Sequence, residues 1–268
     1  MTRVCSRILG STARLVLGKR QEAQMRQIKT ILWDVDGTLL DFEASEEACV
    51  RLCLKKYGAE INEEQMDWYS RRNAFYWKSF EQGEISKECV YLGRFEDFFS
   101  HLGIKHIDPD IFNREYQEAL GNSALPREHA LELCATLNGM FRQYVVTNGS
   151  AVAQTGKLKK SGLENLMDGI FISEQMGTEK PNKEFFDLCS REIPEYDPKT
   201  TMIIGDSLTS DMAGGNNAGL LCCWYNPQKK DALEGLRIDY DISSLKEVYE
   251  ILGISTCRER KVDEREHL

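Results

Sequence analysis

Between Pro126 and Leu252 the sequence alternates between helix-like stretches and short apolar runs, and this alternation is the feature that most constrains the fold. The apolar runs are 144–146, 169–172, 201–204 and 221–224, and the helix-like stretches are about 127–138, 151–161, 183–191, 209–218 and 244–252. Strand-like runs that alternate with helices of about 10 to 15 residues indicate βαβ units. Parallel strands are covered on both faces, so they carry continuous apolar runs of this kind. The sequence therefore predicts an α/β fold with a Rossmann-like parallel sheet and helices on both faces.

One more strand-like run, Thr30-Ile31-Leu32-Trp33, lies upstream of a stretch that has only helical character. That stretch, 42–124, contains helix-like segments at about 45–57, 62–80, 86–102 and 108–121. Four amphipathic helices can bury their apolar stripes on one another. We therefore expect a four-helix unit at 42–124, inserted into an α/β core formed by 27–41 and 125–254.

Polar residues follow the carboxyl ends of four predicted strands. In chain order they are Asp34 and Asp36, then Thr147-Asn148-Gly149-Ser150, then Lys180-Pro181, and last Gly205-Asp206 with Asp211. Ligands of open α/β sheets bind beyond the carboxyl ends of the strands, so we expect these side chains to meet in one site.

The pair Asp34 and Asp36 indicates a bound cation. Alternation along a strand sends residues two positions apart to the same side, and carboxylates that close repel each other unless a cation or proton separates them. Hard oxygen ligands suit Mg²⁺, with Asp206 completing the metal shell, and one carboxylate is then left to attack phosphorus while the other handles a proton. The alternative is a strand that simply ends in an acidic turn.

The other residues suit a phosphoryl group. The Thr147 hydroxyl and the N–H groups of Asn148 and Gly149 can hold a phosphoryl oxygen at a helix N-terminus. Lys180 supplies positive charge as negative charge builds on the equatorial oxygens, and Asp211 either orients a metal-bound water or pairs with Lys180. Each residue alone is explained as a helix cap or a solvated charge. Their order behind the strands of one sheet favours a joint catalytic site.

The order and spacing of these motifs resemble the haloacid dehalogenase superfamily of aspartyl-phosphate phosphohydrolases, from about Ile28 to Leu252. The resemblance implies that Asp34 is the nucleophile, that Asp36 is the general acid and base, and that 42–124 is a helical cap. It implies further roles for four residues: Thr147 and Lys180 hold the phosphoryl group, and Asp206 binds Mg²⁺ together with Asp34 and the backbone carbonyl of Asp36, with Asp211 supporting. The dehalogenase branch lacks the second acid, so Asp36 favours phosphate chemistry.

A narrower resemblance is to the bacterial pyrimidine 5'-nucleotidases that act on normal and modified nucleotides. It rests on 172–177 leading to 180–183, on 205–211, on 214–219 ahead of Trp224, and on Gly93-Arg94-Phe95. It implies a phosphoric monoester hydrolase acting on a pyrimidine nucleoside 5'-monophosphate. Phosphoglycolate phosphatases and sugar-phosphate mutases share much of this pattern and remain alternatives. A regulatory protein that accepts phosphate on Asp34 without turnover is a third, against which Asp36 argues.

Three residues of the helical insertion are candidates for substrate contact. Asn73 and Trp77 lie in a run that combines an amide with aromatic faces, which can hydrogen-bond and stack on a pyrimidine. The alternative is that this aromatic stripe is the core of the bundle. Arg94 either contacts the substrate or forms an ion pair within the cap.

Charge and cysteine content limit the partners and the compartment. Residues 1–26 carry six Lys or Arg and one Glu, which leaves 28 basic and 42 acidic residues in the remainder. Such a body repels polymeric nucleic acid and anionic membranes, so the expected partner is a small-molecule phosphate ester. Nine cysteines without a Cys-x-x-Cys pair favour a reducing cytoplasm over zinc or disulfides.

The two ends of the chain differ from the rest. We expect 1–26 to be a disordered or non-native extension, with a mitochondrial presequence as the alternative because acids are absent before Glu22. The mostly charged segment 255–268 is expected to be a solvated tail. The oligomeric state stays open between a monomer and a homodimer.

Overall fold

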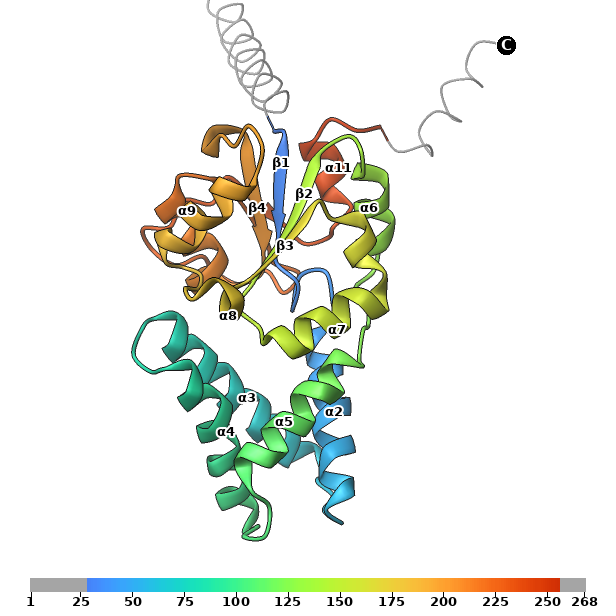
Figure 1. Cartoon of the computed structure of the whole chain (residues 1–268), viewed down its shortest axis with the longest axis vertical. Helices are drawn as coiled ribbons and strands as arrows, with labels where there is room; N and C mark the ends of the chain where they lie inside the picture. The colour runs from blue at the N-terminus through green and yellow to red at the C-terminus, as the bar shows by residue number, and fades with distance from the viewer. Residues whose placement is uncertain (1–27, 256–268) are drawn as a thin grey trace, which may run out of the picture.

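The structure, a computed structural model, describes residues 28–255 and contains a six-stranded sheet with helices on both faces (Figure 1). The strands are β1 (Thr30–Trp33), β2 (Arg142–Thr147), β3 (Gly169–Ile172), β4 (Thr201–Gly205), β5 (Leu221–Tyr225) and β6 (Tyr240–Ile242). Their order is β3-β2-β1-β4-β5-β6, and every pair of neighbours is parallel. The predicted parallel α/β fold is confirmed. Strand β6, a three-residue edge strand, was not predicted.

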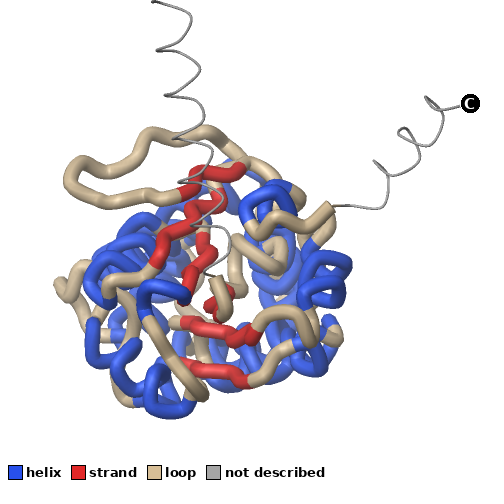
Figure 2. Tube along the Cα trace, turned by 90° about the horizontal axis from the view of Figure 1, so that it is seen from above, coloured by secondary structure: helices blue, strands red, loops and turns tan. Residues whose placement is uncertain are grey.

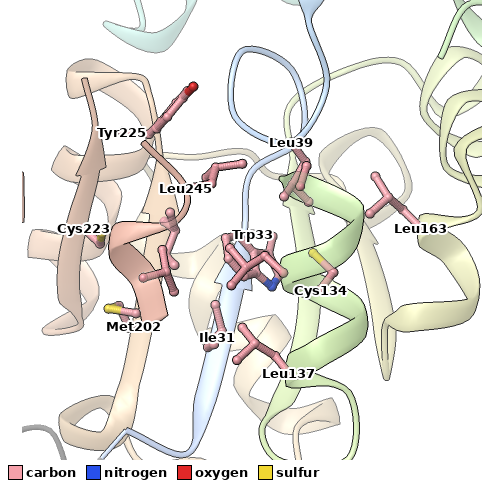
Figure 3. Close-up of a cluster of buried hydrophobic side chains, with 14 of the residues drawn as sticks. Ile31, Trp33, Leu39, Cys134, Leu137, Leu163, Met202, Cys223, Tyr225 and Leu245 are labelled. Atoms are coloured by element: carbon pink, nitrogen blue, oxygen red, sulfur yellow. The ribbon is translucent and has the colours of Figure 1, made fainter. Parts of the chain in front are cut away.

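Side chains of β1 alternate between two buried layers, as a strand requires. Ile31 and Trp33 pack in the layer that contains α6 (Ala130–Leu137) and α11 (Glu247–Ile251), which Figure 3 shows around Trp33. Leu32 packs in the opposite layer, which contains α9 (Lys183–Glu192). Seen from above, the strands lie between helices on two sides (Figure 2).

The remaining short elements of this α/β core follow the strands. They are α7 (Ala151–Ser161), η1 (Leu163–Leu166), α8 (Ser173–Met176), η2 (Pro198–Thr200), the π-helical turn η3 (Leu208–Met212) and α10 (Ala213–Ala218). A single helix was predicted at 209–218, whereas the structure divides this stretch at Ala213. The Ser207 hydroxyl accepts from the Ser210 N–H and so caps the turn that carries Asp211.

Four helices follow β1 and form what we call the helical unit: α2 (Phe42–Lys56), α3 (Glu63–Glu81), α4 (Lys87–Leu102) and α5 (Pro109–Gly121). It has its own core of buried side chains, which includes Phe95, Phe98 and Phe112. The first helix begins three residues earlier than predicted, because the Asp41 carboxylate accepts from the Ala44 N–H and caps it at Phe42. Figure 1 shows the unit at the carboxyl ends of the strands.

Two kinds of contact fix the helical unit to the core. The segments that lead into it and out of it pair with each other, with Asp41 N donating to Leu125 O at 2.8 Å and Arg127 N donating to Leu39 O at 2.9 Å. Helix α5 packs closely on α7, where a Cβ added to Gly156 would lie only 2.5 Å from a backbone oxygen of α5. The unit therefore rests on a helix of the core as well as on its connections.

The expected extension 1–26 and all but the first residue of the expected tail 255–268 lie outside the described residues. None of the helices between residues 28 and 255 is long and apolar enough to span a membrane.

Candidate active site

A cavity of about 300 Å³ lies between the strand ends and the helical unit. The core contributes Asp34, Asp36, Thr147, Asn148, Gly149, Lys180, Asp206, Ser207, Ser210 and Asp211 to its lining. The helical unit contributes Phe42, Glu43, Glu46, Ser70, Asn73, Ala74, Trp77 and Glu81. The structure therefore brings together all the core residues that the motifs singled out.

Lys180 lies at the centre of the core side of this cavity and is buried. Its ammonium group donates to Asp34 Oδ1 at 2.9 Å, to Asp211 Oδ1 at 2.6 Å and to the Val146 carbonyl at 2.7 Å. These contacts use all three N–H groups of a lysine. Burial by itself lowers the pKa of Lys180, but the two carboxylates raise it above its usual value, so the side chain stays charged.

Asn148 holds the backbone of Lys180. Its amide nitrogen donates to the Lys180 carbonyl at 2.8 Å, and its amide oxygen accepts from the Lys180 N–H at 3.0 Å. The side chain of Asn148 therefore positions the lysine, a role that the sequence did not indicate.

Three carboxylates lie close together here, and Lys180 donates to two of them, Asp34 and Asp211. Oxygens of Asp34, Asp206 and Asp211 all lie within 4.8 Å of one another. Burial raises the pKa of Asp34 to about 7 against the opposing charge of Lys180. Asp206 is exposed at the cavity, where the negative charges of Asp34 and Asp211 repel it. The site thus holds more negative charge than Lys180 neutralises.

The donor set fits a hard divalent cation such as Mg²⁺. Asp211 is already engaged, since it accepts from Lys180 and from the Ser207 N–H at 3.1 Å. Asp34 and Asp206 would therefore hold the ion, and their oxygens are the ligand type that Mg²⁺ prefers. The turn passes close to Asp206 at Gly37, where φ is +91° and an added Cβ would lie 2.5 Å from Asp206 Oδ2, so only glycine fits there.

Asp36 is held by two residues that the motifs did not include. Lys157 Nζ donates to Asp36 Oδ1 at 2.6 Å, and Gln154 Nε2 donates to Asp36 Oδ2 at 2.7 Å. Both donors lie on α7 and are buried, Lys157 with only 1 % of its surface exposed. The sequence could have indicated Lys157 as a lysine on the apolar face of a predicted helix, but it could not have shown that Asp36 is its partner.

Some N–H groups at the predicted anion site before and within the first turn of α7 already have partners in the chain. The Gly149 N–H already donates to the Thr147 hydroxyl at 3.2 Å. Within the helix, the Ala153 N–H donates to Ser150 Oγ and the Ala151 N–H donates to Glu174 Oε2 at 2.7 Å. The first turn of α7 is thus capped by side chains, whereas Thr147, Asn148 and Gly149 line the cavity, and their contact with a phosphoryl group remains a prediction.

The three candidates in the helical unit have different positions. Trp77 lines the cavity and makes an edge-to-face contact with Phe80, with ring centroids 6.0 Å apart. Asn73 also lines it, but its amide nitrogen donates to Glu46 at 2.5 Å and its oxygen accepts from Arg94 at 2.8 Å. Arg94 is absent from the lining, is buried, and also donates to Asn113 at 3.0 Å. The structure therefore gives Arg94 hydrogen bonds inside the helical unit instead of a substrate contact or an ion pair.

Side chains of the helical unit also reach the core on two sides of the cavity. On one side Glu81 accepts from the hydroxyls of Ser207 and Thr209. On the other, Lys87 donates to Ser173 Oγ at 3.2 Å and the Tyr91 hydroxyl donates to Glu174 at 3.1 Å. These contacts hold the unit over the strand ends.

Comparison with known proteins gives consistent results. A family model described as haloacid dehalogenase-like hydrolase matches residues 28–219. The chain is 35% identical over 225 residues to the pyrimidine 5'-nucleotidase PynA of Streptococcus pneumoniae, covering 84% of this chain and 94% of that protein. It is 30% identical over 222 residues to the pyrimidine 5'-nucleotidase YjjG of Escherichia coli, with 83% and 96% covered. A magnesium-bound crystal structure of the HAD-hydrolase YfnB from Bacillus subtilis is similar with a TM-score of 0.82 and 35% identity, covering 85% of this chain and all of that one.

We expect Asp206→Asn to abolish the thermal stabilisation that Mg²⁺ gives the wild-type protein. A ligand at 100 times its Kd stabilises a protein by about 2.7 kcal/mol, which differential scanning fluorimetry detects readily. Without Mg²⁺, the neutral amide removes repulsion with Asp34 and Asp211, so the Tm of the variant should equal or exceed that of the wild type. Asp187→Asn, an exposed site paired with Lys183, is the matched control and should respond like the wild type. An undiminished response in Asp206→Asn would place the ion elsewhere.

Proposed function

The chain belongs to the haloacid dehalogenase-like hydrolases, and on this premise we propose that it is a Mg²⁺-dependent phosphomonoester hydrolase that works through an aspartyl phosphate on Asp34. One observation carries the proposal: Lys180 contacts both Asp34 and Asp211 in the floor of a cavity that Asp206 also lines. A nucleophilic carboxylate, a fixed cation and a place for a divalent ion thus meet within one site.

In the first step an Asp34 oxygen forms a bond to phosphorus and the bond from phosphorus to the leaving oxygen breaks, with Asp36 giving that oxygen a proton. In the second step water attacks the phosphoryl group, the bond to Asp34 breaks and Asp36 takes the proton of the water. Mg²⁺ held by Asp34 and Asp206 would supply positive charge that offsets the negative charge of the phosphoryl group. When Asp34 changes from a carboxylate to an acyl phosphate it loses its negative charge, and the Lys180 ammonium group can then donate to the phosphoryl oxygens.

Lys157 and Gln154 fix the orientation of the Asp36 carboxyl group. Each of its two oxygens accepts a hydrogen bond from one of these side chains, and the bond from the Lys157 ammonium group is charge-assisted. Held in this way, Asp36 can take the proton of the water in the second step. We therefore assign Lys157 a positioning role in the hydrolysis of the aspartyl phosphate.

The helical unit acts in this proposal as a cap that excludes water and positions the leaving group. The contacts of Glu81, Lys87 and Tyr91 with the core support it, since they close the cavity on two sides. The magnesium-bound crystal structure of YfnB reveals interdomain movement in that protein. We propose a corresponding movement here, in which these contacts break to admit substrate.

The proposed substrate is a pyrimidine nucleoside 5'-monophosphate. PynA and YjjG, whose names give this activity, align with most of the chain. In the cavity, Trp77 and Phe42 offer aromatic surface to a base beside the phosphoryl site.

A panel of phosphate esters with Mg²⁺ tests this substrate class. We expect kcat/KM for UMP, dUMP and dTMP to exceed that for AMP, phosphoglycolate and glucose 6-phosphate, with released phosphate as the measurement. A higher value for phosphoglycolate would replace the nucleotide assignment and leave the chemistry at Asp34 unaffected. Stable phosphorylation of Asp34 without release would instead favour a regulatory acceptor.

Asp34→Asn should abolish phosphate release, because an amide cannot attack phosphorus. The loss should exceed the ~10² to 10⁴-fold that removal of a positioned acid or base typically causes. Circular dichroism and Mg²⁺-free melting establish that the variant is folded. Turnover near the wild-type rate in folded Asp34→Asn would refute the mechanism.

Lys157→Met should lower kcat by about 10²-fold, the scale of loss when a catalytic group is misplaced. The variant should accumulate phosphorylated enzyme, visible as a burst of p-nitrophenol from p-nitrophenyl phosphate, because water activation is the impaired step. Lys159→Met changes an exposed lysine on the same helix and serves as the control. A kcat equal to that of the control would show that Asp36 needs no help from Lys157.

A further inference from the structure

We propose that Glu46 selects the leaving group of the substrate by accepting hydrogen bonds from its hydroxyl or N–H groups and by repelling leaving groups that carry negative charge. The inference rests on the proposed function and deepens it, because it names the class of leaving group that the site admits. Neutral leaving groups rich in hydrogen-bond donors, such as a nucleoside, belong to that class. Carboxylates and second phosphates do not.

Glu46 lies on α2, has only 3 % of its surface exposed, and lines the same cavity as Asp34 and Lys180. Its Oε2 accepts from the Ser70 hydroxyl at 2.7 Å and its Oε1 accepts from Asn73 Nδ2 at 2.5 Å. Both oxygens therefore act as acceptors, as expected of an ionised carboxylate. An ionised carboxylate has about four acceptor positions, so two remain after these bonds.

The positive charge of Arg94, which does not line the cavity, partly offsets the negative charge of Glu46. Arg94 donates through Nη1 to the oxygen of Asn73, and the nitrogen of Asn73 donates to Glu46. Burial raises the pKa of the Glu46 carboxyl, while the hydrogen bonds from Ser70 and Asn73 and the charge of Arg94 oppose this rise. Because Arg94 does not line the cavity, the substrate meets the carboxylate and not the arginine.

The other acids on this side of the cavity are engaged elsewhere. Glu43 forms an ion pair with Arg127 at 2.7 Å, and Glu81 accepts from Ser207 and Thr209. Within the described chain, Lys180 is the only Lys or Arg that lines the cavity, and it lies at the phosphoryl end beside Asp34. An anionic leaving group would thus meet carboxylates with no cation to pair with, whereas hydroxyl and N–H groups would meet acceptors.

The test compares substrates that differ by one negative charge. One pair is UMP and orotidine 5'-monophosphate, which adds a carboxylate to the ring, and the other is 2-hydroxyethyl phosphate and phosphoglycolate. For each pair that it hydrolyses, the wild type should have the higher kcat/KM for the substrate whose leaving group is neutral. These substrates are UMP and 2-hydroxyethyl phosphate. In Glu46→Gln the ratio of the two kcat/KM values should fall about tenfold or more, mainly because KM rises for the substrate with the neutral leaving group. Hydrogen bonds to charged groups contribute on this scale.

Two controls separate this effect from a general loss of structure. Glu46→Gln should lower kcat/KM for UMP by a larger factor than kcat/KM for p-nitrophenyl phosphate, because the latter's leaving group offers no comparable donor. Glu47→Gln alters the neighbouring acid, which pairs with Arg51 and does not line the cavity, and should leave every ratio unchanged. If Glu46→Gln does not fold, Glu46→Asp is the second variant, because it keeps the negative charge. It should still prefer the substrates with neutral leaving groups, although KM for these substrates should rise.

Three results would overturn the proposal: no preference in the wild type, an unchanged preference in folded Glu46→Gln, or loss of the preference in Glu46→Asp. Failure of the proposed nucleotidase function gives a different result. In that case neither nucleotide is hydrolysed, but the pair of small esters still reports whether Glu46 distinguishes neutral from anionic leaving groups.

Discussion

One ammonium group, that of Lys180, joins three strand ends of the core. It donates to Asp34 after β1, to the Val146 carbonyl in β2 and to Asp211 in the turn after β4. Charges buried in this way persist only when they are paired and hydrogen-bonded. Because Lys180 donates to only two of the three carboxylates, the pairing is incomplete, and the remaining negative charge makes the site receptive to a divalent cation. The chemistry that we propose thus follows from the way the fold buries its charges.

Helix α7 connects the chemistry to the helical unit. One of its faces presents Gln154 and Lys157 to Asp36, while Gly156 allows α5 to approach the helix backbone. Ala153 packs in the core of the helical unit. A displacement of the unit that carried α7 with it would therefore also move the groups that orient Asp36. In the mechanism that we propose, closure over the substrate and activation of water are therefore linked through α7.

The α/β core and the helical unit have different roles in the mechanism that we propose. The strand ends of the core present Asp34, Thr147, Lys180 and Asp206 to the cavity, the groups that in our proposal act on any phosphate ester. The helical unit provides the wall that a leaving group meets, with the Trp77 ring and the Glu46 carboxylate on it. Chemistry and selectivity thus rest on different elements, so the wall can change without disturbing the strand ends.

The sequence by itself determined the parallel sheet, because continuous apolar runs separated by helices have few other solutions. It also placed the four helices of the insertion within a few residues, since capping residues such as Asn62 and Ser86 act on their immediate neighbours. The motif residues Asp34, Asp206 and Lys180 could be singled out because each follows an apolar run.

Only the tertiary structure decided which groups face one another. Asp36 and its partner Lys157 are 121 residues apart, and no local pattern joins them. The same holds for Arg94, buried against Asn73 and Asn113, and for Glu46, whose neighbours come from another helix. The three-residue strand β6 is defined by pairing with β5 and has too short an apolar pattern of its own. Periodicity and capping are interactions between near neighbours, whereas these contacts exist only after distant segments have packed.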